Sequence, residues 1–160
     1  MIHVAPLAKI STRQWQKLMR LLSKDAVIWS EMVHARAILN ADLEYIASRY
    51  FRPEEDRVGR YVLQVASGHE TELVDVVKTL SRSRFWDFFD EINLNCGCPA
   101  PSAGAGGHGA VLLKDQSRLK VRKQFYWFVV CCMFFLLSQF RISSMRWSKL
   151  WMVVRMCQRK

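Results

Sequence analysis

The chain has 160 residues, 51% of them hydrophobic, which supports one ordinary globular domain and excludes a disordered or collagen-like chain. Its net charge of +10 resembles that of nucleic-acid-binding proteins until the charges are located. Residues 1–118 carry 15 Lys and Arg against 14 Asp and Glu, whereas residues 119–160 carry 9 Lys and Arg and no acid. The excess charge therefore belongs to the C-terminal segment.

Short apolar runs alternate with helical patterns from the N-terminus onward. We expect a strand at 3–7, followed by a helix that begins at a capping box formed by Ser11 and Gln14. That helix should lay one apolar face on a sheet. The face consists of Trp15, Leu18, Met19 and Leu22. A second apolar run at 27–29 precedes another helical segment at 37–47.

The alternation continues through the middle of the chain. A third strand is expected at 61–65, and a second capping box at Ser67 and Glu70 predicts the helix after it. The apolar face of that helix consists of Leu73, Val76, Val77 and Leu80. A fourth strand at 91–95 leads into a loop rich in Gly, Ala, Pro and Ser, with a helix starting near Ala110.

Strand and helix thus alternate about four times, which predicts parallel βαβ units in an α/β fold. A barrel and an open sheet both satisfy this pattern. Two of the strands end in polar residues, Gln64 and Asn95. Because α/β proteins assemble their sites at the carboxyl ends of strands, these residues are candidates for function.

The segment Asn95-Cys96-Gly97-Cys98-Pro99 places an amide and a thiol three residues apart in a sharp turn. It is either a site or a capped strand end with two small packed cysteines, and these residues alone favour packing. The five cysteines of the chain form no CxxC pair and no Cys/His set with zinc-ligand spacing. We therefore expect no metal site.

A longer stretch, Phe89-Asp90-Glu91-Ile92-Asn93-Leu94-Asn95-Cys96-Gly97-Cys98-Pro99, resembles the active-site strand of the tRNA-dihydrouridine synthases. Further landmarks of that family are matched in the same order. They are Val4-Ala5-Pro6-Leu7, Arg20-Leu21-Leu22-Ser23, Ser30-Glu31-Met32-Val33, Pro53-Glu54-Glu55 and Val62-Leu63-Gln64. The resemblance covers about residues 3–113 and is greatest to the A-type bacterial branch.

The resemblance implies a TIM barrel that holds FMN, followed by a helical domain that helps to grip tRNA. In the family, reduced FMN delivers hydride to carbon 6 of a uracil, a cysteine protonates carbon 5, and NADPH regenerates the flavin. Residues 1–118 would then be the N-terminal half of such a domain, a partial (β/α)8 TIM barrel of about four βα units. A complete barrel takes about 250 residues.

The resemblance also assigns roles to individual residues. Cys98 matches the family's acid, and Cys96 stands where the family varies. A cysteine thiol with an ordinary pKa of about 8.5 is largely protonated at neutral pH and can serve as a general acid. Flavin contacts are implied for Pro6, Leu7 and Ala8 against the isoalloxazine ring, for Gln64 as its hydrogen-bonding partner, and for Asn95, which also contacts the target base. Proline-ended and capped strand ends are the alternative explanation for these residues.

The resemblance weakens in the loop after Pro99. The register returns at Gly109, but the polar and basic side chains of the A-type branch are replaced at 100–108. Gly104, Gly106 and Gly109 match a dinucleotide fingerprint, which we reject because Cys98 and Pro99 separate the glycines from the strand and no acid follows at the required distance. We expect a flexible loop instead.

The substrate implied by the family is a uridine flipped out of a tRNA loop. Basic side chains could meet its phosphates, although we favour ordinary solvated charges because residues 1–118 are nearly neutral. These side chains are Arg36, Arg49, Arg52, Arg57 and Arg60.

Residues 119–160 form a basic, apolar tail that contains an unbroken run of 13 apolar residues, Phe125 to Leu137. The tail is either a membrane-associated element over residues 125–140 or unselected sequence appended to a truncated reading frame, and we favour the latter. We see no counterpart there of the second half-barrel. Without a signal peptide, an intracellular, cytoplasmic location is expected.

Overall fold

The computed structural model describes residues 2–52 and 58–114. The Pro53-Glu54-Glu55 landmark, Arg57 and the tail at 119–160 lie outside the described residues, so the predictions made for them stay predictions. No helix within the described ranges is long and apolar enough to cross a membrane.

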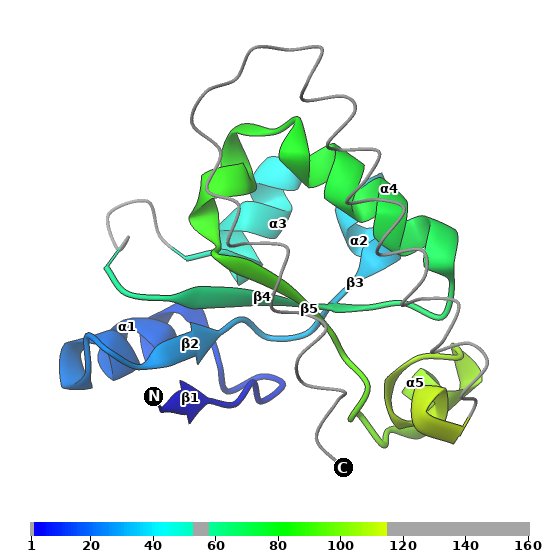
Figure 1. The fold of residues 1–160 in the computed structure, drawn as a ribbon, viewed down its shortest axis with the longest axis horizontal. Helices are drawn as coiled ribbons and strands as arrows, with labels where there is room; N and C mark the ends of the chain where they lie inside the picture. Colours follow the sequence, from blue (N-terminus) through cyan, green and yellow to red (C-terminus); the bar gives the residue numbers. More distant parts are fainter. Residues whose placement is uncertain (1, 53–57, 115–160) are drawn as a thin grey trace.

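The described chain is a parallel sheet with helices (Figure 1). Its strands are β1 (His3–Val4), β2 (Val27–Trp29), β3 (Val33–His34), β4 (Tyr61–Ala66) and β5 (Glu91–Leu94). Its helices are α1 (Arg13–Leu22), α2 (Ala35–Asn40), α3 (Leu43–Tyr50), α4 (Glu70–Ser81) and α5 (Pro101–Ala105), with short 3-10 helices η1 (Arg84–Phe88) and η2 (Gly109–Lys114).

The order of the strands distinguishes the two architectures that the sequence left open. β2 and β3 both pair with β4, β2 with its start and β3 with its end, so together they fill one strand position. The interruption lies at Ser30, whose Oγ accepts a hydrogen bond from Gln64 N (2.9 Å). The positions β1, β2 with β3, β4 and β5 then follow chain order, all parallel. This is the order of consecutive barrel units, without the reversal of a doubly wound sheet.

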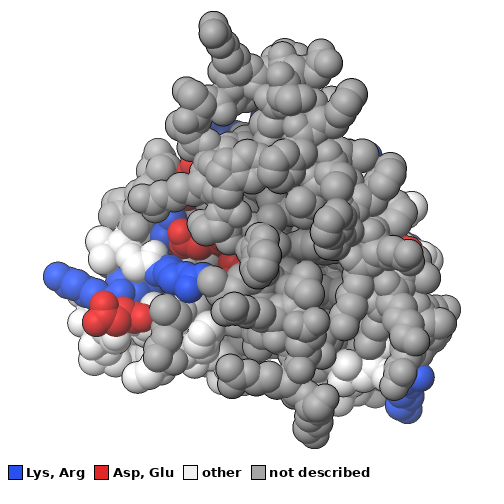
Figure 2. All heavy atoms as spheres, in the orientation of Figure 1, with Lys and Arg blue, Asp and Glu red and all other residues white. Residues whose placement is uncertain are grey.

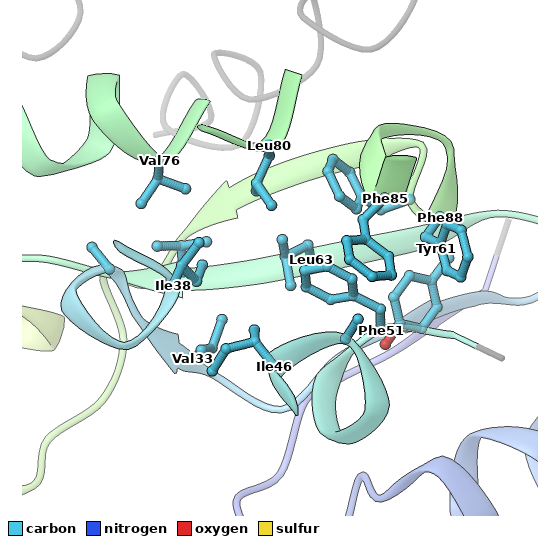
Figure 3. Packing of buried hydrophobic residues seen from close by; sticks show 14 of the residues in the cluster. Val33, Ile38, Ile46, Phe51, Tyr61, Leu63, Val76, Leu80, Phe85 and Phe88 are labelled. Atoms are coloured by element: carbon cyan, nitrogen blue, oxygen red, sulfur yellow. The ribbon is translucent and has the colours of Figure 1, made fainter. Parts of the chain in front are cut away.

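The main core lies between the sheet and the helices that cover one of its faces. Figure 1 shows α2, α3 and α4 together on one side of β4. Tyr61 and Leu63 of β4 point to this side because side chains alternate along a strand. Val76 and Leu80 of α4 face the same core, as the helical spacing predicted (Figure 3). The aromatic part of this core consists of Phe51, Phe85, Phe88 and Phe89.

The predictions for the first helix were wrong in two respects. Its N-cap is Thr12, whose hydroxyl accepts from Trp15 N, whereas the Ser11 hydroxyl accepts from Leu7 N in the preceding turn. The predicted face is also misplaced, because Leu18 is 51% exposed and Leu22 72% exposed. The buried side chains of α1 are Gln16 and Arg20. Both donate hydrogen bonds to backbone carbonyls, and Met19 of the predicted face packs against the main core.

Three other elements differ from expectation for local reasons. The helix expected at 37–47 is divided into α2 and α3, because Asp42 caps a new helix by accepting from Glu44 N (3.0 Å). The second capping box does not form, since the Ser67 hydroxyl donates to Glu72 and α4 starts after His69. The loop expected to be flexible contains the short helix α5, which begins with a proline in its first turn.

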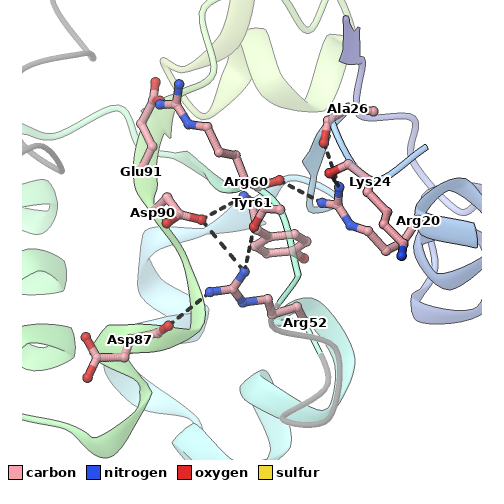
Figure 4. A network of polar contacts seen from close by, with 10 residues as sticks. Arg20, Lys24, Ala26, Arg52, Arg60, Tyr61, Asp87, Asp90 and Glu91 are labelled. Carbon is pink, nitrogen blue, oxygen red and sulfur yellow. Dashed lines mark hydrogen bonds and ion pairs between the residues drawn. The ribbon is translucent and has the colours of Figure 1, made fainter. Parts of the chain in front are cut away.

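The amino ends of the strands are held by buried arginines (Figure 4). Arg20 donates to the backbone carbonyls of Ser23, Lys24, Ala26 and Arg60. Arg52 donates to Gly59 O and Asp87 O and lies 3.7 Å from the carboxylate of Asp90. Gly59, at φ +71°, has no room for a side chain, because a Cβ would lie 2.2 Å from the Arg20 guanidinium.

Candidate active site

Polar side chains gather at the carboxyl ends of β4 and β5. The two strands are parallel neighbours, and Gln64 pairs with Asn93 in their register. Asn95 follows Asn93 by two residues and therefore lies on the same face. Gln64 and Asn93 are buried, at 7% and 9% exposure, in a position where unpaired polar groups are costly. Hydrogen bonds between these amides therefore help to stabilise them in this position.

A relay of hydrogen bonds joins these amides to the cysteine turn. Asn95 Oδ1 accepts from the backbone N–H groups of Gly97 (3.2 Å) and Cys98 (3.0 Å). Asn95 Nδ2 donates to Gln64 Oε1 (2.8 Å), and Gln64 Nε2 donates to Asn93 Oδ1 (3.2 Å). The predicted residues Gln64, Asn95 and Cys98 are thus brought together in one hydrogen-bonded site.

The backbone of Cys98 is fixed from two sides. Its N–H donates to Asn95, and its carbonyl accepts from Ala110 N (2.9 Å). Gly109, at φ +73°, lies so close that a Cβ there would be 2.5 Å from Cys98 O. Around Gly97, in contrast, a Cβ would meet no atom within 4 Å. The Cys98 turn is therefore held against the η2 segment, while the space beside the exposed Gly97 is open.

Pro6, Leu7 and Ala8 follow β1, the first strand of the sheet. Leu7 N donates to Ser11 Oγ (2.9 Å), and Leu7 O accepts from Ile10 N and Ser11 N, so the strand ends in a turn. The turn is tied to the next strand position through Lys9 N, which donates to Glu31 Oε2 (3.0 Å). No hydrogen bond in the described chain joins Pro6, Leu7 or Ala8 to the amide relay, and their flavin contact stays a prediction.

Two neighbours of the site escaped the sequence analysis. Asn93 was counted as part of a strand, although its two-residue spacing from Asn95 was a usable signal for a shared face. His108 is 7% exposed and makes an edge-to-face ring contact with His34, with 5.0 Å between the centroids. Burial, followed by the neighbouring His34, lowers the pKa of His108. No sequence signal linked two histidines so far apart.

Several arginines considered for phosphate contacts are paired with protein groups. Arg36 forms a 2.6 Å ion pair with Glu72, and Arg60 lies 3.4 Å from Glu91. Arg52 is buried in the amino-end network described above. On the described part of the face in Figure 2, basic and acidic side chains lie next to one another. These pairings favour ordinary structural charges over a phosphate-binding patch.

The fold and the site together define a barrel-type α/β protein with amides and a thiol at the carboxyl edge of its sheet. Residues 3–121 match the model of the dihydrouridine synthase family. The chain therefore belongs to the dihydrouridine synthase family.

Individual relatives agree with this assignment. The chain is 34% identical over 116 residues to a tRNA-dihydrouridine(20/20a) synthase of Xanthomonas axonopodis pv. citri, covering 72% of this chain and 32% of that protein. The enzyme of the same name from Synechocystis is 32% identical over 70% of this chain and 31% of its own length. A tRNA-dihydrouridine(47) synthase [NAD(P)(+)] of Scheffersomyces stipitis is 30% identical over 72% of this chain and 18% of its own length.

These names are in line with the A-type bacterial branch that the landmark motifs indicated. The chain spans about a third of the length of the first bacterial relatives it matches.

Proposed function

We propose that this chain contributes the active-site strand of a tRNA-dihydrouridine synthase, which reduces uridine in tRNA to dihydrouridine. The observation that carries the proposal is the relay from Gln64 through Asn95 to the Cys98 turn. It joins, in space, residues that the family resemblance matched one by one along the sequence. The bacterial and yeast relatives, all named as tRNA-dihydrouridine synthases, support it.

The chemistry of these side chains suits a flavin ring. Gln64 Nε2 and Asn95 Nδ2 each use one amide hydrogen within the relay and keep a second for a ligand. A flavin ring offers carbonyl oxygens and ring nitrogens as acceptors. We infer that FMN binds here, with Gln64 and Asn95 at its polar edge and Pro6, Leu7 and Ala8 against its plane.

When bound and reduced, the flavin supplies hydride to carbon 6 of the uracil ring. The role inferred for Cys98 is to hold a proton on Sγ and to release it to carbon 5 as the carbon 5 to carbon 6 double bond is lost. Asn95 positions this thiol, because its Oδ1 holds the backbone of the turn. General acids placed in this way contribute about 10²- to 10⁴-fold to rate.

The partners follow from this chemistry. A uracil must leave its stack to reach a thiol at the end of a sheet, so the substrate would be a flipped uridine in a tRNA loop, inside the cell. NADPH is proposed as the reductant that regenerates the flavin. The printed name of the yeast relative includes NAD(P), which supports a nicotinamide reductant.

The test compares the two cysteines in the whole chain. FMN binding is followed by flavin fluorescence, and dihydrouridine is measured on unmodified tRNA with NADPH. We expect Cys98→Ala to bind FMN normally and to lose at least about 100-fold in dihydrouridine formation. Cys96→Ala, the matched control, should retain activity. Full activity in Cys98→Ala refutes the role of the thiol, and a wild-type chain that binds no FMN refutes the flavin site in this chain.

A further inference from the structure

We propose that Asn93 is an additional ligand-binding residue of this site, which donates through Nδ2 to a ring carbonyl oxygen while its Oδ1 holds Gln64. This inference deepens the proposed function and rests on it. The ring carbonyl belongs either to the flavin or to the target uracil, since both carry this acceptor.

The first step is the direction of the amide relay. Amide oxygen and nitrogen atoms look alike, so their assignment has to come from partners of fixed polarity. The backbone N–H groups of Gly97 and Cys98 can only donate, so the Asn95 atom that faces them is Oδ1. Asn95 therefore turns Nδ2, a donor, toward Gln64.

The remaining assignments follow from this anchor. Gln64 must meet Asn95 Nδ2 with Oε1, so its Nε2 faces Asn93. Asn93 in turn must meet Nε2 with Oδ1, which leaves Nδ2 as the free end of the relay. Gln64 and Asn93 pair in the strand register, so strand pairing itself brings the two amides together.

The second step concerns what Asn93 Nδ2 can bind. In the described chain the amide nitrogen Nδ2 of Asn93 donates no hydrogen bond, although the residue is only 9% exposed. Glu91, two residues earlier on the same face, already has its Oε2 paired with Arg60 at 3.4 Å. The nitrogen itself is not sealed off from solvent, so a ligand that displaces water can accept its hydrogen bond.

The third step is selectivity. The amide hydrogens that the relay leaves unused, on Asn95 Nδ2, Gln64 Nε2 and Asn93 Nδ2, can be donated to a ligand. These donors favour neutral ligand edges that carry carbonyl oxygens. Flavin and uracil rings both offer such oxygens.

The test separates the two functions of Asn93 by substitution in the whole chain. Asn93→Asp keeps an oxygen for Gln64 Nε2 in nearly the same shape but removes the donor. Asn93→Leu removes both. Asn40→Asp is the matched control for the added charge, because Asn40 lies exposed on α2 and donates to Arg36 O. The relay is followed by the side-chain amide resonances of Gln64 and Asn95, and binding is followed with FMN and with unmodified tRNA.

We expect Asn93→Asp to preserve the amide resonances but to weaken binding of one ligand by at least about tenfold, whereas Asn40→Asp changes neither. Weaker FMN binding assigns the carbonyl to the flavin. Unchanged FMN binding with weaker tRNA binding assigns it to the uracil. Affinity should recover as pH falls and the new carboxyl becomes protonated, because a protonated carboxyl donates again.

Wild-type affinity for both ligands in Asn93→Asp overturns the inference and leaves the proposed function standing. A wild-type chain that binds neither FMN nor tRNA overturns the proposed function as well. The two failures are therefore distinguishable, since one appears in the variant and the other in the unaltered protein.

Discussion

The two edges of the sheet use their polar residues in different ways. At the amino edge, the guanidinium of Arg20 donates hydrogen bonds to four backbone carbonyls of the protein itself. At the carboxyl edge, the side-chain amides of Gln64, Asn93 and Asn95 are hydrogen-bonded to one another, and some of their N–H groups remain available to donate to a ligand. An edge whose donors are consumed internally stabilises the fold, whereas an edge with donors to spare can bind a ligand. In barrel proteins, likewise, the amino end of the sheet serves stability and the carboxyl end carries the active site.

The contrast predicts that the largest loss of stability comes from the amino edge. Arg20→Met keeps the aliphatic stem but removes a donor from four carbonyls, of which Arg60 O keeps its bond from Ile28 N, so the free energy of unfolding should fall by about 3–5 kcal/mol. Arg84→Met is the matched control, because Arg84 pairs with Glu44 on the surface at 60% and 59% side-chain exposure. Its effect should stay below about 1 kcal/mol. Urea unfolding measures both, and equal effects would contradict the structural role of Arg20.

At the carboxyl edge, a smaller change in stability should have a larger effect on the site. Gly109→Ala forces a side chain into a position at φ +73° and against Cys98 O, which should cost about 2–3 kcal/mol and displace the thiol. Gly97→Ala, in the open space two residues after Asn95, should change stability by less than about 0.5 kcal/mol. Urea unfolding and the alkylation rate of the Cys98 thiol compare the two variants. Equal rates in Gly109→Ala and the wild type would show that Gly109 does not position the cysteine.

The smallest expected effect is a pH dependence confined to the carboxyl edge. Burial, with His34 as the second cause, lowers the pKa of His108, whereas the unfolded chain takes up the proton near its ordinary value of about 6.5. The unfolded state then binds more protons as pH falls below that value, so stability falls with it until the folded-state pKa is passed. His108→Phe keeps a ring against His34 and should reduce this loss. Urea midpoints between pH 5 and 8 measure it, and parallel curves for variant and wild type would exclude His108 as the source.

Some elements could be predicted because their causes are local. The strand at 61–65 and the buried face with Val76 and Leu80 were confirmed, since alternation and helical spacing are set by the residues themselves. The direction of α1 could not be predicted in this way. The buried Arg20 donates to carbonyls of the loop after α1 and to Arg60 O, 40 positions along the chain, while Leu18 and Leu22 lie exposed.

The sequence by itself determined the family, the alternation of strand and helix, and the polar residues at the strand ends, because motif order and periodicity are properties of the chain alone. Only the tertiary structure decided the order of the strands and the relay that connects Gln64, Asn93 and Asn95. The order depends on which strands pair, and the relay depends on the register between β4 and β5, which backbone hydrogen bonds set between residues about 30 positions apart. Sequence therefore indicated which residues to examine at the carboxyl edge, and strand pairing added Asn93 to them.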